Sequence, residues 1–415
     1  MIRDSRLDPT RQEWLQAGGL RRIFAVIEAG GGRLRIVGGA VRDALLEKEI
    51  GEVDLACDLP PEKTAEILAK AGIKVAPTGI EHGTITAVVD HQGYEITALR
   101  RDIETDGRRA KVEFTDDWQA DAARRDFTIN AIYADADGTL YDYFGGRGDL
   151  AEGRVRFIGQ AEARIREDVL RILRFFRFYA FFGRGDADAE GLRASAALAH
   201  LLPQLSAERV WREIGKLLAA ENPAPSWRLM GANGVLAQVL PDAADVARLE
   251  GLLAAEKKYE VAGAAQAGAA LTRLAALLPQ DEAVAAQVAA KLKMARREAE
   301  RVRLLAVLPA RLRGRCDPLP LRCALYDYGA DACRAAALLL AASDRGIDLD
   351  PVLAAAAAWD NPVFPLQGAD ILQLGVAPGP RVGEILRAVE EWWMARDFRP
   401  GKKECLDEAK RLAAA

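Results

Sequence analysis

Two adjacent glycines and an arginine are the first residues of this 415-residue chain whose types and spacing suggest chemistry. Gly38 and Gly39 follow a short apolar run and precede a helix-forming run, so a backbone without side chains can approach a phosphate closely there. The start of the helix offers free N–H groups and the positive end of its dipole. Arg42, on the first helical turn, can bind the same phosphates. We therefore expect a triphosphate to bind at this turn.

Two carboxylates follow shortly after this turn. Glu52 and Asp54 lie two positions apart on a predicted strand, so both side chains point to one face. Two aligned carboxylates beside a phosphate site suit a pair of Mg²⁺ ions, one activating an attacking hydroxyl and one neutralising departing pyrophosphate. Glu95, on a later predicted strand, is expected to be a third acidic ligand if that strand lies alongside. Solvation of a strand end is the alternative for such residues.

A further group of charged residues is predicted on one helix that starts near residue 161. Asp168 and Arg171 are spaced i, i+3 and would share a face, with Arg174 and Arg177 continuing the stripe. A carboxylate accepts from the exocyclic amine of cytosine or adenine, while a guanidinium donates to the neighbouring ring acceptors. Uracil and guanine place a carbonyl where that amine would be. The alternative is a salt bridge on a solvated helix, either Arg164–Asp168 or Glu167–Arg171.

The elements that position these residues divide the chain into two kinds of structure. Up to about residue 150 strand and helix signals alternate, and after Gly159 the helical pattern continues to the end without a convincing strand. We expect an α/β head followed by all-α segments. The head is predicted to contain strands Arg33–Val37, Glu52–Ala56, Thr84–Asp90 and Tyr94–Arg100, the last two as a hairpin, and helices Ala40–Lys48 and 61–71.

Composition restricts the class of protein. Half of the residues are hydrophobic and 28% are charged, as in globular proteins without membrane spans, and no apolar run approaches the ~20 residues of such a span. The five cysteines form no CxxC pair, which favours reduced thiols in a cytoplasmic protein. The net charge of −4 excludes a generally basic nucleic-acid binder, yet residues 154–184 contain eight arginines against three carboxylates.

Several motifs in order resemble the bacterial class II tRNA CCA-adding enzymes, which are relatives of bacterial poly(A) polymerases. The motifs are GGAVRD, the E-x-D pair, TALRRDIETDGRR, RRDFTINA (Arg124–Ala131), YFGGRGDL (Tyr143–Leu150), REDVLRILRFFRF (Arg166–Phe178), SAERVWREI (Ser206–Ile214) and GADILQLGVAPGPRVGEIL (Gly368–Leu386).

The resemblance implies four domains. They are a polymerase-β-type nucleotidyltransferase head at 1–150, a helical neck at 151–220, a helical body at 221–360 and a tRNA-binding tail at 361–415. It also implies roles for single residues. Glu52 and Asp54 would bind two Mg²⁺ ions, and the nucleotide would be bound by Gly39, Arg42, Arg125, Asp168, Arg171, Arg174 and Arg177.

Three points qualify the resemblance. Asp106, Gly107, Arg108 and Arg109 read as a polar loop, and in the family a flexible loop at this place is required for adding the final A. Most of the family has aspartate at the position of Glu52, so we expect altered metal reach. Glu47 replaces a glycine that is common in the family, a change expected to matter little.

The expected function is addition of CCA to the 3′ end of tRNA from CTP and ATP, in the cytoplasm and without a membrane partner. A poly(A) polymerase or a dedicated A-adding enzyme on the same scaffold is the main alternative. A catalytically inactive tRNA-binding relative is the third, with Glu52 marking lost metal binding.

Overall fold

The structure is a computed structural model that describes residues 5–8, 10–106, 109–260, 268–313, 318–344 and 346–414. The chain divides into two compact units, residues 1–241 and 242–415. Within the described residues every strand lies in the first unit, and the second unit is helical. The predicted α/β head with helices after it is therefore confirmed.

A mixed seven-stranded sheet forms the centre of the first unit, in the order β3-β4-β5-β2-β1-β8-β9. β2 and β5 are parallel, and the other neighbours are antiparallel. β6 and β7 form a separate antiparallel pair. The bounds are β1 Leu34–Val37, β2 Asp54–Cys57, β3 Lys74–Gly79, β4 Thr84–Val89, β5 Gln92–Ala98, β6 Arg100–Asp106, β7 Arg109–Phe114, β8 Ile132–Ala134 and β9 Leu140–Asp142.

The predicted hairpin is confirmed as β4 and β5. Asp90 and His91 connect the strands with φ angles of 51° and 63°, which is the left-handed pair of a two-residue turn that matches strand twist. β5 then lies beside β2, with Asp54 opposite Glu95 in the register. Since directly paired residues point to the same face of a sheet, the two carboxylates share one face, as the sequence suggested for Glu95.

One strand prediction needs correction. The predicted strand Glu52–Ala56 begins two residues later, at Asp54. Glu52 therefore lies in the segment before the strand, and the i, i+2 alternation of a strand does not fix its direction. Asp54 is the first residue of β2, at the end of the strand that meets the Gly38 turn, because Asp54 pairs with Val37 on β1.

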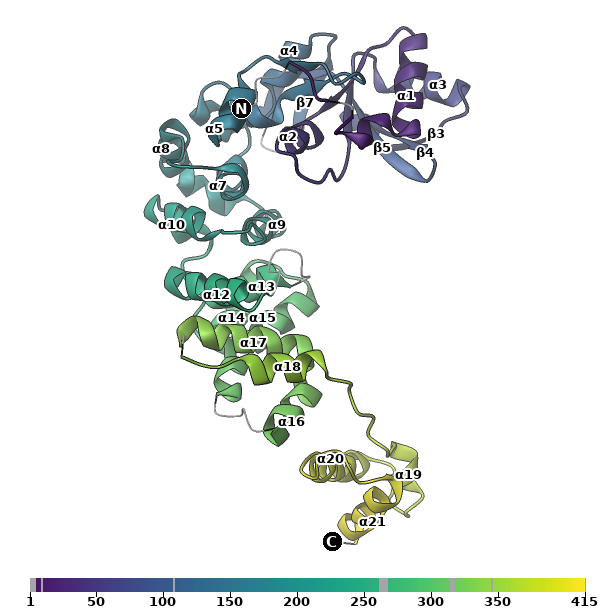
Figure 1. Cartoon of the computed structure of the whole chain (residues 1–415), viewed down its shortest axis with the longest axis vertical. Helices are drawn as coiled ribbons and strands as arrows, with labels where there is room; N and C mark the ends of the chain where they lie inside the picture. The colour runs from purple at the N-terminus through teal and green to yellow at the C-terminus, as the bar shows by residue number, and fades with distance from the viewer. Residues whose placement is uncertain are drawn as a thin grey trace. The chain divides into compact units, whose positions relative to one another are not determined.

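Helices cover the sheet and continue the first unit beyond it (Figure 1). α1 and α3 pack on one face, over the apolar core that contains Leu20, Ile23, Ile36 and Leu55. The α-helices are α1 Gly18–Ala29, α2 Gly39–Leu45, α3 Pro61–Lys70, α4 Trp118–Ala123, α5 Gly146–Glu152, α6 Ala161–Glu167, α7 Arg171–Phe182, α8 Ala189–Leu198, α9 Ala207–Leu218, α10 Ala224–Ala232 and α11 Val235–Val239. Short 3-10 helices are η1 Glu13–Gln16, η2 Ile80–His82, η3 Thr128–Asn130 and η4 Ala199–Gln204.

The single helix predicted from residue 161 is wrong. It breaks at Asp168, where the backbone is extended (φ −149°, ψ 106°), and α6 ends there. The Asp168 carboxylate accepts a hydrogen bond of 3.1 Å from the Leu170 N–H, the local bond through which aspartate competes with a helix. Asp168 and Arg171 consequently lie on either side of a helix junction and do not form an i, i+3 pair.

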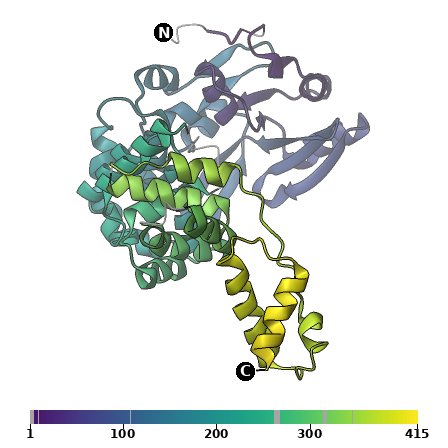
Figure 2. The ribbon, with the colours of Figure 1, turned by 60° about the horizontal axis from the view of Figure 1, so that its bottom comes forward.

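The second unit contains two apolar clusters. One joins α12, α13, α15, α16, α17 and α18, and the other joins α19, α20 and α21. α20 and α21, yellow in Figure 2, lie side by side. No helix among the described residues is long and apolar enough to cross a membrane. The bounds are α12 Val246–Lys258, α13 Ala269–Leu277, α14 Glu282–Lys291, α15 Arg296–Leu312, α16 Pro318–Tyr328, α17 Ala330–Ser343, α18 Asp350–Ala357, α19 Gly368–Leu372, α20 Pro380–Met394 and α21 Lys402–Ala413.

Candidate active site

A polar cavity of about 510 Å³ lies in the first unit and brings most of the predicted site residues together. Its lining comes from the Gly38 turn, the start of β2, the segment after α4, the α6–α7 junction and α9. Glu52, Glu95 and Arg177 were also predicted site residues but do not line it. The lining residues are Gly38, Gly39, Arg42, Asp54, Arg125, Asp126, Asn130, Asp168, Leu170, Arg171, Arg174, Phe178 and Arg209.

The glycine turn faces two guanidiniums. Gly38 has φ 77° and ψ −122°, a conformation that a residue with a Cβ rarely adopts. A Cβ at Gly38 would lie 3.8 Å from Arg125 Nη1, and one at Gly39 would lie 3.7 Å from Arg42 Nη2. The backbone of the turn and these two guanidiniums therefore lie close together at the cavity.

Arg42 is held in place by polar and aromatic contacts. It donates to both Asp43 carboxylate oxygens at 2.9 and 3.0 Å, and to Asn130 Oδ1 at 2.7 Å. Its guanidinium also lies over the Phe182 ring, 4.2 Å from the centroid. Phe182 is the last residue of α7, so the end of that helix contributes to the position of an arginine of the glycine turn.

Three carboxylates lie close enough to influence one another. Partial burial first, and the Glu52 charge second, raise the pKa of Asp54, while Arg125 acts in the opposite direction. Partial burial and the charges of Asp54 and Glu52 likewise raise the pKa of Glu95. Among the described residues, no group of three or more His, Cys, Asp and Glu side chains is already arranged around one point. The arrangement is a concentration of negative charge next to the cavity.

Arg125 reaches the cavity from a buried network. Asp121, 1% exposed, forms ion pairs with Arg124 at 2.7 Å and Arg125 at 3.1 Å. It also accepts a hydrogen bond of 2.7 Å from the Tyr133 hydroxyl. Burial alone would raise the pKa of Asp121, but the two arginines and Tyr133 outweigh burial and lower it to about 2.

Replacing Asp121 by asparagine is expected to lower the free energy of unfolding by about 2 kcal/mol at pH 7, from the pKa shift alone. Because the pKa is lower in the folded state than its ordinary 3.8, this contribution is present above pH 4 and lost as the pH falls toward 2. Urea unfolding of both proteins from pH 7 down to pH 3 checks this. A difference that does not shrink below pH 4 would show that the charge of Asp121 is not its cause.

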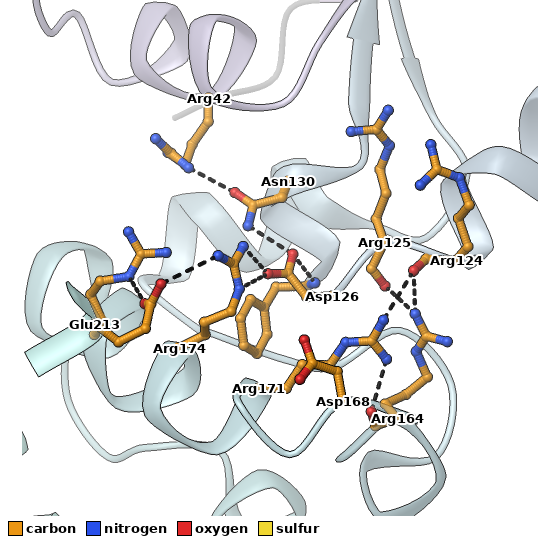
Figure 3. Close-up of polar contacts among 12 residues, drawn as sticks. Arg42, Arg124, Arg125, Asp126, Asn130, Arg164, Asp168, Arg171, Arg174 and Glu213 are labelled. Carbon is orange, nitrogen blue, oxygen red and sulfur yellow. Dashed lines mark hydrogen bonds and ion pairs between the residues drawn. The ribbon is translucent and has the colours of Figure 1, made fainter. Parts of the chain in front are cut away.

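Asp126 and Asn130 connect the arginine of the glycine turn to those of α7 (Figure 3). Arg174 donates to Asp126 Oδ2 through Nε at 2.8 Å and Nη2 at 2.5 Å. Asn130 donates to Asp126 Oδ1 at 3.0 Å and accepts from Arg42. Although burial opposes ionisation, Arg174 and Asn130 lower the pKa of Asp126. This chain of contacts joins α2, η3 and α7 around the cavity.

Glu213 of α9 pairs with two arginines of α7. Its carboxylate lies 2.7 Å from Arg177 Nε and 3.8 Å from Arg174 Nη1, and its side chain is 5% exposed. Burial lowers the pKa of Arg177, and Glu213 acts against this. Arg177 is thus predicted correctly to share a helix face with Arg174, but it contacts Glu213 and does not line the cavity.

Arg171 takes part in the salt bridge that was the alternative interpretation of this segment. It lies 2.7 Å from Glu167, which also pairs with Arg164. Figure 3 shows Arg171 and Arg164 directed at the backbone carbonyls of Arg124 and Arg125. The pair therefore connects α6 to the segment after α4, and Arg171 still lines the cavity.

Asp168 forms an ion pair that was not predicted. Arg209 Nη2 donates to both oxygens of the Asp168 carboxylate, at 2.9 and 3.0 Å. Sequence reasoning also missed Asp121, Asp126 and Glu213. Arg209 and Glu213 are spaced i, i+4 in the SAERVWREI motif, so helical spacing would have placed both on one face of α9.

The predicted loop at 106–109 falls partly outside the described residues. Gly107 and Arg108 belong to the part that is not described. Asp106 and Arg109 are the last and first residues of β6 and β7 and pair with each other in the register. The functional importance of this loop stays a prediction.

Comparison with known proteins gives consistent matches over nearly the whole chain. Residues 34–156 match the family described as the Poly A polymerase head domain, and residues 188–246 match the probable RNA and SrmB-binding site of polymerase A. The chain is 36% identical to the mitochondrial CCA tRNA nucleotidyltransferase 1 of Mus musculus over 95% of this chain and 90% of that one. It is 34% identical to the CCA-adding enzyme of Streptococcus sanguinis, over 89% and 90% of the two chains.

Solved structures give the same result. The crystal structure of the Bacillus stearothermophilus CCA-adding enzyme in complex with CTP matches with a TM-score of 0.78 and 26% identity, covering 98% of both chains. The Thermotoga maritima CCA-adding enzyme complexed with tRNA matches in fold, with a TM-score of 0.63 and 20% identity over 99% and 96% of the two chains.

Proposed function

This chain belongs to the CCA tRNA nucleotidyltransferase family, and from that premise we propose that it adds C, C and A to the 3′ end of tRNA. The nucleotides come from CTP and ATP without a nucleic-acid template, and pyrophosphate is released. The observation that carries the proposal is that one cavity contains the glycine turn, Asp54 and Asp168. A phosphate site, a carboxylate at the reacting end and a base-selecting carboxylate are thus within reach of one nucleotide.

The family uses divalent metal ions, and the carboxylates of this chain fit them. Asp54, Glu52 and Glu95 place negative charge next to the cavity. Partial burial, and after it these neighbouring charges, raise the pKa values of Asp54 and Glu95, and carboxylate oxygens are the ligands that Mg²⁺ prefers. We assign two Mg²⁺ ions to Asp54 and Glu52, with Glu95 as a third ligand. When bound, the ions would activate the 3′-hydroxyl of tRNA and neutralise the departing pyrophosphate.

The arginines bind and orient the triphosphate. Arg42 and Arg125 each have a guanidinium nitrogen within 4 Å of where a Cβ on Gly39 or Gly38 would lie, so an anion bound at the turn would be close to both guanidiniums. Since each arginine already has a carboxylate partner, its direction is fixed before the nucleotide arrives. Fixed donors of this kind orient the α-phosphate for in-line attack without reorganisation.

Selection of the base depends on hydrogen-bond polarity at the α6–α7 junction. The carboxylate of Asp168 accepts from the exocyclic amine of cytosine or adenine, and Arg171 donates to the adjacent ring acceptor. The carbonyl of uracil or guanine would face the carboxylate, leaving two acceptors opposed. Arg174 stays paired with Asp126 and shapes the wall on which the base lies.

The helical segments are assigned to tRNA. We retain the four domains at 1–150, 151–220, 221–360 and 361–415, with the tail as the segment that binds tRNA by shape and phosphate contacts. The match of residues 188–246 to an RNA-binding family supports RNA contacts that begin in the neck.

The test uses purified protein with Mg²⁺ and three tRNA transcripts that end before CCA, after C and after CC. Each is incubated with CTP, ATP, both, or UTP and GTP, and the products are sized on a gel. We expect growth to a CCA end that then stops, and no product when EDTA replaces Mg²⁺. Long A tails would establish a poly(A) polymerase, and A addition to the CC-ending transcript alone would establish an A-adding enzyme. No extension despite tRNA binding would contradict enzymatic activity and point to Glu52.

A further inference from the structure

The Arg209–Asp168 ion pair joins two helices at the base-selecting position. Asp168 lies at the junction of α6 and α7, outside the regular hydrogen bonding of either helix. Its carboxylate also accepts the 3.1 Å bond from the Leu170 N–H, at Oδ1. One backbone bond to one oxygen holds the carboxylate at a single point. Arg209 Nη2 contacts both oxygens, so a second contact, from α9, helps to hold the group in place.

We propose that Arg209 is a positioning residue for base selection, acting through the Asp168 carboxylate. The proposal rests on the function proposed above and adds a residue of α9 to the groups that determine which nucleotide is incorporated. Asp168 and Arg209 both line the cavity, and Arg209 and the Leu170 N–H together hold the carboxylate there. A base then meets an acceptor of fixed direction.

Fixing this direction affects discrimination more than binding. Without Arg209, a carboxylate held by the backbone bond alone moves more easily out of line with the amine of cytosine, and it also turns its lone pairs more easily away from the carbonyl of uracil. The favourable contact weakens and the unfavourable contact is relieved, so the two nucleotides become more alike. Discrimination against uracil depends on the repulsion between its carbonyl and the Asp168 carboxylate, so it is lost when the carboxylate turns away.

A purely structural role predicts different behaviour. The side chains of Arg209 and Asp168 are 27% and 28% exposed, and ion pairs with such access to water contribute little to stability. Removing Arg209 is therefore expected to change the melting temperature slightly. A large change in nucleotide choice with an intact fold is a combination that a structural salt bridge does not produce.

The experiment measures kcat/KM for CTP and for UTP on the transcript ending before CCA, in wild type, Arg209→Gln, Arg209→Lys and the control Arg212→Gln. Arg212 is an exposed arginine on the same helix. We expect the CTP/UTP ratio to fall about tenfold in Arg209→Gln, the size typical of coupling between two contacting charged groups. Arg209→Lys should restore part of the ratio, and Arg212→Gln should leave the ratio unchanged.

Asp168→Asn and the double variant Asp168→Asn/Arg209→Gln complete the cycle. If Arg209 acts through Asp168, then Arg209→Gln changes the ratio in the wild-type background but not in the Asp168→Asn background. An unchanged CTP/UTP ratio in a folded Arg209→Gln protein would overturn the inference, as would equal effects in both backgrounds. Absence of CTP addition by the wild type would instead refute the proposed function, so the two failures are distinguishable.

Discussion

Replacement of Asp54 by asparagine is expected to lower nucleotide incorporation by about 10³-fold or more while leaving the fold as stable as wild type, or more stable. Ligands that hold a catalytic metal contribute several kcal/mol of transition-state stabilisation, and each ~1.4 kcal/mol is a factor of ten in rate. Stability should not follow activity, because Asp54 is repelled by Glu52 and lies opposite Glu95 in the sheet. An amide of the same shape relieves that repulsion.

Two measurements separate these effects. Single-turnover addition of CTP gives the loss of activity, and thermal melts with EDTA and with Mg²⁺ give the stability. Mg²⁺ should raise the melting temperature of the wild type but not of Asp54→Asn, since the ion stabilises only the state that binds it. The control is Asp90→Asn in the β4–β5 turn, an exposed position whose φ of 51° asparagine accepts. A less stable Asp54→Asn protein, or one with near-normal activity, would contradict this assignment of the carboxylates.

Replacement of Glu213 by alanine is expected to lower stability, unlike the Asp54 replacement. We expect a loss of about 3 kcal/mol or more in the free energy of unfolding. Glu213 is buried and lies between Arg174 and Arg177. Removing its carboxylate leaves the Arg177 guanidinium, 14% exposed, without its charge partner. An uncompensated buried charge costs more than a missing surface pair contributes.

Hydrogen exchange in α7 and α9 is the suitable measurement, because it reports on this unit separately from residues 242–415. Urea unfolding followed by circular dichroism gives the size of the effect. Removing both charges in Arg177→Met/Glu213→Leu should recover much of the loss, since an apolar pair can replace a buried ion pair. The exposed Glu221, just after α9, provides the control Glu221→Ala. A loss below about 1 kcal/mol in Glu213→Ala would mean that water compensates Arg177.

Local sequence signals predicted the phosphate side of the site well. The glycine turn, α2 and the hairpin follow from helix and strand patterns and turn chemistry, which depend on a few neighbouring residues. Glu95 was named only on the condition that its strand lies beside that of Asp54, which local patterns do not decide. β3 and the strands from β6 onward were missed. β8 and β9 have three residues each, too few for an alternation pattern, and their pairing depends on partners far along the chain.

On the side of the cavity that we propose selects the base, the sequence named residues that line the cavity, but it did not predict how they are arranged. The apolar spacing around Asp168 is compatible with one continuous helix. The break in the helix at Asp168 accompanies contacts of its carboxylate with Arg209 of α9 and with the Leu170 N–H, and the contact with α9 cannot be read from the local sequence. Buried partners such as Asp121 and Glu213 leave no sequence signal of their own, since charged residues usually lie on the surface. Their burial follows from how the elements pack.

The glycine that is common in the family at the position of Glu47 now has a structural reason. Glu47 has a φ of 54° at the end of α2, a left-handed conformation that costs a residue with a Cβ roughly 1–2 kcal/mol. The expectation that this replacement matters little is therefore too generous. Its effect falls on stability, because Glu47 does not line the active-site cavity.

The residues that line the cavity lie far apart in the sequence, and this has a consequence for the synthesis of the protein. The lining begins at Gly38 and ends at Arg209, so a ribosome that has completed the sheet has not yet supplied the last wall. At translation rates of roughly 5–20 residues per second, the delay between these two residues is about 10 to 30 s. During that interval the nascent head has its carboxylates and glycine turn but lacks Arg209 and Glu213. With the roles proposed above, nucleotide selectivity would be acquired after the segment that carries the carboxylates has emerged, and a product truncated before α9 would contain Asp54 and the glycine turn without Arg209.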